Sequence, residues 1–475
     1  MVADAEPRTL DVTQFFENTG FTRFHVWLLV ISSFVTLFDG LDFSLISFTI
    51  PYLRDELHLT DAMMGNVTAA AFVGQMVGSL YGSYVADIYG RRPVIIWCTI
   101  AGAAFTFVTG FASSAEMIIV LRLLGGLAIG GLLAPAWSLN IESMPSGMKA
   151  TAVTIIMLGF SIGGAAAGQV TNLLAPDHGW QAVFFACGVG TMALALILLF
   201  TLPESARWMV ARGREPAVVM PILSRFNPGL EIDRYTDIVL SDENRFAFDD
   251  THDASFIKRS TMNFLRTMGQ LFRGTLAFIT PVIWFTYFCS SFAIYMRVSF
   301  GVIFLEQLGV DRIEGTNIGS FGGLVGAVGA VILLKFTEKR GPLWIALAPL
   351  LGVPAMLAVG FGLTSGPMFI PVVVLGTIFV GIGHAAVISI TTIYYPSAVR
   401  STGGGWASFV AKIAAVAAPL VGAAWFIHDR AAVLNGYAFT GYCLAGVVVG
   451  IVALAFYARR LHAERELETT EPVVA

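Results

Sequence analysis

Two carboxylates, Asp39 and Asp42, interrupt an apolar run that extends from Phe24 to Ile50. They stand three residues apart, so on a helix they lie on one face. A carboxylate near the centre of a bilayer costs roughly 2.5–3.5 kcal/mol on insertion scales, and two close carboxylates in a low-dielectric site cannot both ionise cheaply. We therefore expect one of them to hold a proton near neutral pH, as a proton-coupling site requires. The alternative interpretation is a structural pair bonded to neighbouring helices.

Two polar side chains with possible chemistry lie inside later apolar runs. Arg297, in YMRVSFG, is predicted to be an anion contact, which would suit a substrate with two carboxylates or an unusually large one. Its alternative role is to reach the outer headgroups of the membrane. His384, in VGIGHAAVIS, belongs to the residue type that titrates in the physiological range. It either relays a proton or contacts substrate, or it is a core histidine bonded to a backbone carbonyl.

Aromatic side chains on the central segments could stack on a substrate ring. Because 12% of the chain is aromatic, the alternative for each is packing or anchoring at the membrane interface. The candidates are Phe38, Phe43, Trp137, Trp284, Tyr287 and Tyr295.

The elements that must position these residues are expected to be membrane-spanning helices. Of the 475 residues, 56% are hydrophobic and only 13% are charged, whereas a soluble protein carries about 25% charged residues. Twelve apolar segments reach the roughly 20 residues that cross a bilayer. They are 24–50, 62–86, 93–112, 116–141, 149–172, 180–202, 276–305, 314–335, 342–363, 367–394, 403–427 and 432–457.

Basic residues set the predicted orientation. With the N-terminus inside, most of the 28 Lys and Arg residues fall in cytoplasmic segments and only Arg54, Arg312 and Arg430 fall outside, as the positive-inside rule requires. The predicted fold class is an all-α membrane protein with both termini cytoplasmic. Its predicted parts are a cytoplasmic N-terminal tail (1–22), an N-terminal six-helix half (23–202), a cytoplasmic central loop (203–275), a C-terminal six-helix half (276–458) and a cytoplasmic C-terminal tail (459–475).

Other functional classes find little support in the sequence. GFSIG at 159–163 matches a hydrolase pattern that needs a strand–turn–helix setting, but it lies inside a predicted span, where Gly159 and Gly163 have the spacing of close helix packing. The acidic N-terminus lacks the basic region of a signal peptide. We predict neither an enzyme nor a cofactor, metal site or nucleic-acid partner. The cysteines have no metal-ligand spacing and all lie in apolar runs: Cys98, Cys187, Cys289 and Cys443.

Two predicted cytoplasmic loops recur in the second half of the chain. ADIYGRRP after the second span matches TEKRGPLW after the eighth, so that Asp87 corresponds to Glu338. PSGMKAT after the fourth span matches PSAVRST after the tenth, so that Lys149 corresponds to Arg400. Both matches have the same sequence offset. This indicates two pseudo-symmetric six-helix halves of parallel orientation, which is the larger repeat of a secondary transporter.

These loops also carry a resemblance to a known family. SYVADIYGRR resembles a loop signature of the major facilitator superfamily, although Ser83 stands where glycine is usual and Ile88 where a basic residue is usual. LRLLG at 121–125 is similar to its span-four signature, and LPESARW at 202–208 to the end of span six in its sugar and organic-anion members. DGLD in the first span and YPSAVRSTGGGW at 395–406 resemble the aromatic acid:proton symporters of this superfamily.

The resemblance implies roles for further residues. Arg122 matches the superfamily arginine that is tied to proton coupling. Lys412 stands where these symporters usually have an arginine that contacts the substrate carboxylate, so the charge is kept but the bidentate fork is lost; its alternative is to snorkel or to pair with an acid. A cytoplasmic gate, in which Glu142 would share a charge network with Lys149, is expected from charged residues of the repeated loops. They are Asp87, Arg91, Arg92, Glu142, Lys149, Glu338 and Arg400.

The function that this resemblance implies is proton-coupled uptake of an aromatic carboxylate by alternating access. The substrate would be a benzoate-type or lignin-derived acid, and the protein a multi-pass monomer in the inner membrane, with protons and the lipid bilayer as its other partners. One alternative is a carrier of another organic anion or a sugar acid. A second, from another class, is a membrane sensor that binds aromatic acids without moving them.

Overall fold

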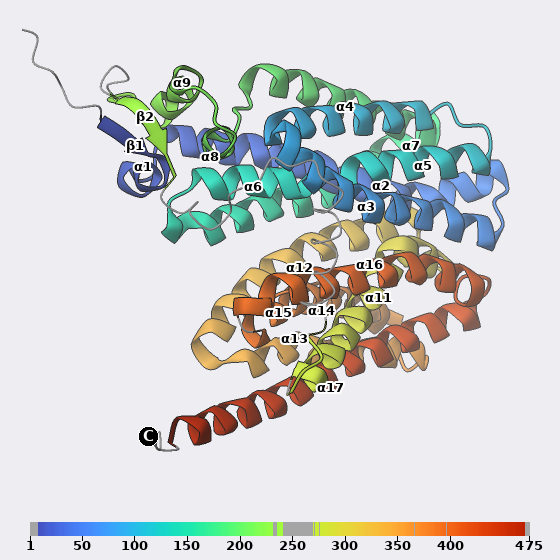
Figure 1. Ribbon diagram of the computed structural model, residues 1–475. Coiled ribbons are helices and arrows are strands. Elements are labelled where there is room, and N and C mark those ends of the chain that lie inside the picture. The colour runs from blue at the N-terminus through green and yellow to red at the C-terminus, as the bar shows by residue number, and fades with distance from the viewer. Residues whose placement is uncertain are drawn as a thin grey trace, which may run out of the picture. The chain divides into compact units, whose positions relative to one another are not determined.

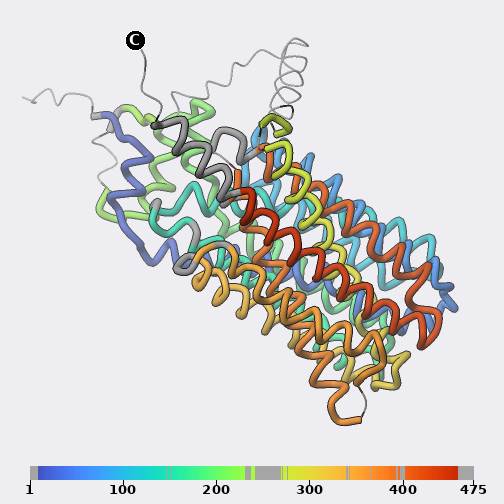
Figure 2. The backbone as a smooth tube through the Cα atoms, turned by 90° about the horizontal axis from the view of Figure 1, so that it is seen from below, coloured from blue at the N-terminus to red at the C-terminus, as the bar shows by residue number. Residues whose placement is uncertain are grey.

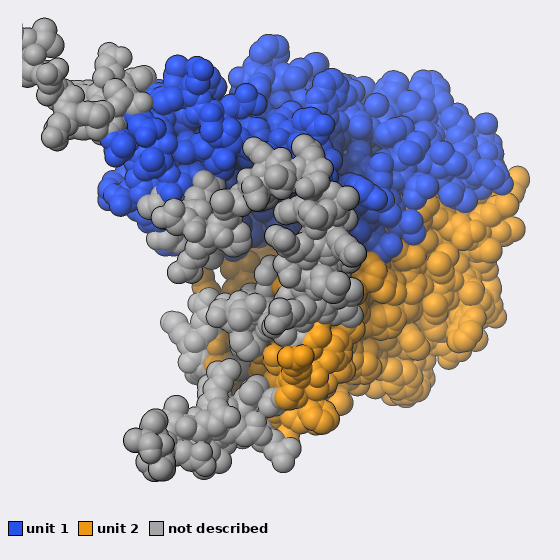
Figure 3. All heavy atoms as spheres, in the orientation of Figure 1, with its two compact units in different colours: residues 1–45, 73–250 blue, residues 46–72, 251–475 orange. Residues whose placement is uncertain are grey.

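Almost all the described secondary structure is helical. The computed structural model describes residues 8–230, 235–240, 269, 271–274, 276–364, 366–395 and 397–470. Contacts between Cα atoms divide the chain into two units (Figure 3). The first consists of Met1–Leu45 with Val73–Asp250, and the second of Ile46–Phe72 with Thr251–Ala475.

Two long helices each contribute one end to each unit. They are α2 (Arg23–Leu57) and α3 (Asp61–Tyr89). The other elements of the first unit are β1 (Arg8–Asp11), α1 (Val12–Thr19), α4 (Arg91–Thr109), α5 (Ala115–Gly130), α6 (Leu133–Ser143), the 3₁₀ turn η1 (Ser146–Met148), α7 (Lys149–Thr201), α8 (Ala206–Ala211), α9 (Pro216–Phe226) and β2 (Tyr235–Val239). Those of the second unit are α11 (Leu276–Gln307), α12 (Arg312–Arg340), η4 (Pro342–Ala346), α13 (Leu347–Gly360), η5 (Gly366–Met368), α14 (Phe369–Val387), α15 (Ile390–Tyr394), α16 (Ser397–Trp425) and α17 (Arg430–Thr470).

The helices match the predicted spans. Within the described residues, ten helices are long and apolar enough to cross a membrane by length and composition. One of them, α7, contains Gly179 at φ 76°, a left-handed conformation that glycine tolerates and that interrupts a helix; it separates the predicted fifth and sixth spans. The 29-residue α3 coincides with the predicted second span but is not among the ten. Helical structure therefore lies over each of the twelve predicted segments.

Glycines bring α2 and α7 into backbone contact in the first unit. A Cβ atom on Gly163 would meet the carbonyl oxygen of Leu37, and one on Gly40 would meet that of Phe160. Backbones approach this closely only where side chains are missing, as the small-residue spacing predicted. The part of α2 that carries both aspartates is therefore held directly against α7.

A small assembly of short elements joins the N-terminal and central segments. Strand β1 pairs in parallel with β2, with Arg8 opposite Tyr235. Helices α1, α8 and α9 lie beside these strands (Figures 1 and 2). Phe16 of α1 packs on Phe226 of α9, with ring centroids 5.1 Å apart, and both side chains are buried. The sequence analysis described 1–22 and 203–275 only as a polar tail and loop and did not predict this assembly.

Helix α11 is the most connected helix of the second unit. It contacts α12, α14, α16 and α17, so a side chain on its buried faces meets several neighbouring helices. The part of α2 after Leu45 and the first half of α3 also pack in this unit. Phe48 lies against Gly319 of α12, and Gly65 against Ala423 of α16.

Candidate functional site

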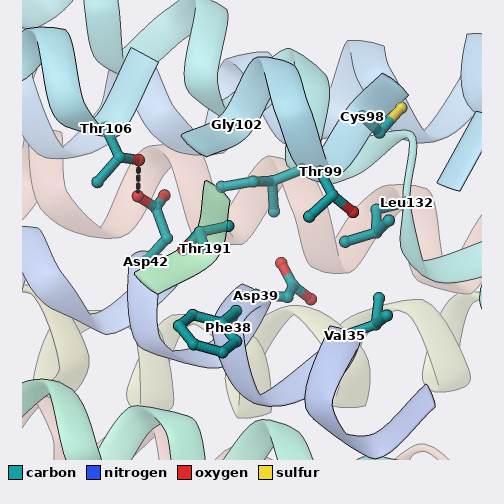
Figure 4. A pocket seen from close by; sticks show the side chains of 11 residues that line it. Val35, Phe38, Asp39, Asp42, Cys98, Thr99, Gly102, Thr106, Leu132 and Thr191 are labelled. Carbon is teal, nitrogen blue, oxygen red and sulfur yellow. Dashed lines mark hydrogen bonds between the residues drawn. The ribbon is translucent and has the colours of Figure 1, made fainter. Parts of the chain in front are cut away.

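Asp39 borders a small cavity among α2, α4 and their neighbours in the first unit. Its side chain is only 3% exposed and, in Figure 4, points into the space beside Thr99. Thr106 and Thr191 also line the cavity. The cavity volume is about 20 Å³, which holds roughly one water-sized molecule. In this conformation, the cavity therefore suits a proton path and is too small for an aromatic acid.

Asp42 forms a buried ion pair with Arg122 of α5. Arg122 Nη1 lies 3.3 Å from Asp42 Oδ1 and 3.4 Å from Oδ2, and the Thr106 hydroxyl donates to Oδ1 as well. Arg122 is 2% exposed and also donates to the Thr109 hydroxyl at 3.1 Å. Its guanidinium carbon lies 5.2 Å from the centre of the Phe184 ring.

The two carboxylates therefore have different surroundings. The sequence analysis treated Asp39 and Asp42 as two acids that compete for one proton. In the structure, the charge on Asp42 is neutralised by Arg122, a partner far away in the sequence. A change in the protonation state of Asp39 therefore leaves the Asp42–Arg122 ion pair in place.

The aromatic candidates of the first unit are only partly gathered at this cavity. Phe38 lines it. Phe43 packs on the Phe160 ring at 5.3 Å. Trp137 lies against a separate buried cluster that includes Met144. Of the three, only Phe38 lines the cavity beside the two aspartates.

The remaining predicted substrate residues lie in the second unit. His384 on α14 is bonded through Nδ1 to the Ser290 hydroxyl at 3.1 Å, so its partner is a side chain and not the predicted backbone carbonyl. The Tyr287 hydroxyl donates to the carbonyl oxygen of Ile388 at 2.7 Å, which occupies it in helix packing. Lys412 is half-buried on α16.

Arg297 is buried between helices. Its side chain lies on α11, is 6% exposed and donates to Tyr437 of α17 and Thr377 of α14. The alternative in which it reaches the headgroups does not describe this conformation, because α11 continues for ten residues beyond Arg297 and turns this side chain toward its neighbours.

The predicted gate residues form a network within the first unit. Arg91 Nη2 pairs with Glu142 Oε1 at 2.9 Å and with Asp87 Oδ1 at 3.1 Å. The other Glu142 oxygen accepts from the Ser205 hydroxyl. Glu142 and Lys149 are predicted to belong to one charge network, and in this conformation the cation that pairs with Glu142 is Arg91, the first residue of α4. The side chains of Glu338 and Arg400 lie outside the described residues.

Glu204 is a half-buried acid beside this network that the sequence analysis did not single out. Its carboxylate accepts from the backbone N–H groups of Arg91 and Arg92 at 3.0 and 3.2 Å, which places an acid at the N-terminus of α4, where the helix dipole favours it. The Arg92 side chain also bonds to this segment, because it donates to the carbonyl oxygen of Leu202. Burial raises the pKa of the Glu204 carboxyl, and the backbone N–H donors oppose that rise in part. The sequence signal for this residue was the acid in LPESARW, which the sequence analysis used only as a family motif.

A second missed feature is a charged cluster that joins α2 to α11 and α12 in the second unit. Glu306 Oε1 accepts from Arg54 at 3.1 Å and from Arg312 at 2.7 Å. Arg312 also donates to Asp55 at 2.7 Å and lies over the Tyr52 ring, 4.5 Å from its centre. The sequence analysis used Arg54 and Arg312 only to orient the chain.

Glu306→Gln should weaken this cluster in a salt-dependent way. The change removes one of the two carboxylates that Arg54 and Arg312 share, since both arginines also pair with Asp55. The group is partly exposed, so the loss should be about 1 kcal/mol or less. Thermal unfolding of the purified protein in low and high salt measures it, and the difference from wild type should shrink in high salt as screening increases. Glu314→Gln, at an exposed position of α12, is the control. An equal shift for Glu314→Gln, or one that ignores salt, would contradict the assignment.

Comparisons with known proteins agree with this architecture. The family model of the Major Facilitator Superfamily matches residues 32–419. The inward open conformation of the xylose transporter XylE from E. coli superposes with a TM-score of 0.66 at 15% identity, over 90% of this chain and 95% of that chain. A bacterial homologue of the lysosomal transporter Spinster, inward-facing and occupied, gives a TM-score of 0.67 at 17% identity, over 93% and 98%. At these identities the likeness shows the fold, which is that of the superfamily.

Curated relatives match along most of the chain. The 4-hydroxybenzoate transporter PcaK of Pseudomonas putida is 28% identical over 427 residues, which cover 88% of this chain and 91% of the relative. The gallate transporter of the same organism is 28% identical over 417 residues, covering 87% and 88%. The sialic acid transporter NanX of Escherichia coli is 27% identical over 191 residues, covering only 40% and 46%.

Proposed function

The chain belongs to the Major Facilitator Superfamily, and from this premise we propose that it takes up an aromatic carboxylate together with protons, across the inner membrane, by alternating access. It is a membrane transporter, as its relatives and structural neighbours are, and it is not an enzyme. The observation that carries the proposal is the buried acid Asp39 at a water-sized cavity, next to an Asp42 that Arg122 already neutralises.

The aromatic acid is supported by the relatives that match most of the chain, which are named for 4-hydroxybenzoate and gallate. In the proposed cycle, the half-buried Lys412 of α16 holds the substrate carboxylate, and Asp39 takes up the coupled proton on one side and releases it on the other.

Each residue of the proton site has a separate task. Asp39 carries the proton, because its titration leaves the Asp42–Arg122 pair intact. Asp42 and Arg122 fix the positions of α2 and α5 next to it and keep their own charges balanced. On the cytoplasmic side, Arg91 and Glu142 are proposed to act in gating through the network of the repeated loop.

Asp39→Asn should uncouple transport from the proton gradient. The amide keeps the size of the side chain but cannot exchange a proton, so substrate should still equilibrate across the membrane while accumulation driven by a pH gradient falls at least about tenfold. Uptake of labelled 4-hydroxybenzoate into proteoliposomes, with and without an imposed gradient, measures both quantities. Asp177→Asn, at an exposed position, should behave as wild type.

Gradient-driven accumulation at the wild-type level in Asp39→Asn would refute the proton role of this residue. The same assay separates the main alternative substrate class. The partial match to a sialic acid transporter favours a sugar acid as the second candidate. Competition by sialic acid, with no competition by benzoate or gallate, would identify a sugar-acid carrier.

A further inference from the structure

Arg297 is a buried cation whose described partners are all neutral. Nη1 lies 3.4 Å from the Tyr437 hydroxyl, and Nη2 donates to the Thr377 hydroxyl. The guanidinium carbon lies 5.6 Å from the centre of the Tyr437 ring. Its Nε finds no acceptor among the described residues. No carboxylate of the described chain is within ion-pair distance of this arginine, although it is only 6% exposed.

The surroundings of Arg297 resemble those of Arg122, except that the carboxylate is missing among the described residues. Arg122 also lies between threonine hydroxyls and the face of an aromatic ring, but it is neutralised by Asp42. In the sequence repeat, α11 of the second unit corresponds to α2 of the first. Helix α14 corresponds to α5 together with α6. In the second unit the arginine lies on the helix that corresponds to the one bearing Asp42, and none of the described carboxylates of this unit is within ion-pair distance of it. Hydroxyls and a ring face stabilise a guanidinium but do not cancel its charge.

The side chains next to Arg297 along the contact of α11 with α14 are polar. Ser290 is seven residues before Arg297 and hence on the same face of α11. Across the contact, it meets His384, which is seven residues after Thr377 on α14. Two positions of this contact, seven residues apart on each helix, therefore pair polar side chains.

We infer that Arg297, with Thr377 and Tyr437, forms a subsite for a carboxylate of the substrate, additional to the one assigned to Lys412, and that the chain therefore accepts an aromatic dicarboxylate. The inference rests on the proposed function. A buried charge that no acid of the chain compensates is tolerated where an opposite charge is supplied by the ligand. A guanidinium matches a carboxylate in a bidentate fork. The Tyr437 hydroxyl can add a further donor, whereas the Thr377 hydroxyl donates to the carbonyl oxygen of Val373 and accepts from Arg297, so it orients the guanidinium.

The test compares mono- and dicarboxylates in proteoliposomes. Wild type should take up terephthalate or isophthalate as well as 4-hydroxybenzoate under an imposed pH gradient. Arg297→Met should lower dicarboxylate uptake at least tenfold relative to its own 4-hydroxybenzoate uptake, and Arg297→Lys should lower it less. Thr377→Val keeps the arginine but removes the hydroxyl that accepts from it. The guanidinium is then less well oriented, so the apparent KM for the dicarboxylate should rise several-fold with little change for 4-hydroxybenzoate.

A binding measurement keeps the inference testable if transport fails or a variant is unstable. The measurement is thermal unfolding of the purified protein in chloride-free gluconate buffer. Terephthalate should stabilise wild type and Thr377→Val more than benzoate does. In Arg297→Met, the two ligands should stabilise the protein equally. An unchanged uptake ratio in Arg297→Met, with 4-hydroxybenzoate uptake intact, would overturn the subsite but not the proposed function. Stabilisation by added chloride that depends on Arg297 and matches that by terephthalate would also overturn it, because the occupant would then be an inorganic anion. Absence of all aromatic acid uptake in wild type would instead refute the proposed function.

Discussion

Replacing Asp42 by Asn should destabilise the protein more than replacing Asp42 and Arg122 together. The single change leaves a 2% exposed guanidinium with only the hydroxyls of Thr106 and Thr109 and the Phe184 ring. Removing one partner of a buried ion pair typically costs about 3–5 kcal/mol, because the remaining charge is uncompensated. In Asp42→Asn with Arg122→Gln, both charges are gone, so much of that loss should be recovered.

The measurement is a double-mutant cycle in thermal unfolding of the purified protein. Asp42→Asn and Arg122→Gln should each lower the free energy of unfolding strongly, and the double variant should be less affected than either. Asp177→Asn, the exposed control, should stay within about 0.5 kcal/mol of wild type. Additive losses in the cycle would show that the two side chains do not compensate each other. Transport should be impaired in all three variants of the pair, since the geometry beside Asp39 changes in each.

Gly163→Ala should be the most damaging single-methyl change in the first unit. Its Cβ would meet the backbone carbonyl of Leu37, which cannot rotate away as a side chain could. Helices α2 and α7 would have to separate along the segment that carries both aspartates. Overpacking of this kind typically costs about 1–3 kcal/mol, and here it also displaces the proton site.

Two alanine variants serve as matched controls for the seam between α2 and α7. At Gly164, the nearest atom is the Ser44 hydroxyl oxygen at 3.0 Å, the end of a small side chain that can turn away. At Gly323 on α12, no atom lies within 4 Å. We expect the folded yield and gradient-driven uptake to fall sharply for Gly163→Ala, modestly for Gly164→Ala and not at all for Gly323→Ala. Equal yields for Gly163→Ala and Gly323→Ala would show that the seam tolerates a methyl group.

The spans could be predicted from the sequence because their signal is local. About 20 apolar residues in a row satisfy the length requirement whatever surrounds them, and helical structure lies over each predicted segment. The shared face of Asp39 and Asp42 follows from their spacing alone. The partner of Asp42 could not be predicted, because Arg122 is brought to it by the packing of α5 against other helices and no local pattern encodes that contact.

The surroundings of Arg297 could not be predicted from the sequence either. Its distance from the end of the apolar segment 276–305 was compatible both with a position at the lipid headgroups and with an anion contact. Which of the two occurs depends on the face of α11 that bears the residue and on Thr377 and Tyr437, which belong to helices far along the chain. The preference of Glu142 for Arg91 over Lys149 likewise depends on where α3 ends relative to α6.

The parallel pairing of β1 with β2 has a consequence for synthesis on the ribosome. Arg8 leaves the ribosome early, but its partner Tyr235 appears only after the whole of α2 to α9 has been made. At roughly 5–20 residues per second, the N-terminal strand waits on the order of ten to fifty seconds for its partner. For nearly all of that time, Phe16 of α1 also has no Phe226 of α9 to pack against. The two strands can therefore pair only after the first six spans have been synthesised. A tag that blocks residues 8–11 should delay maturation without altering any membrane helix.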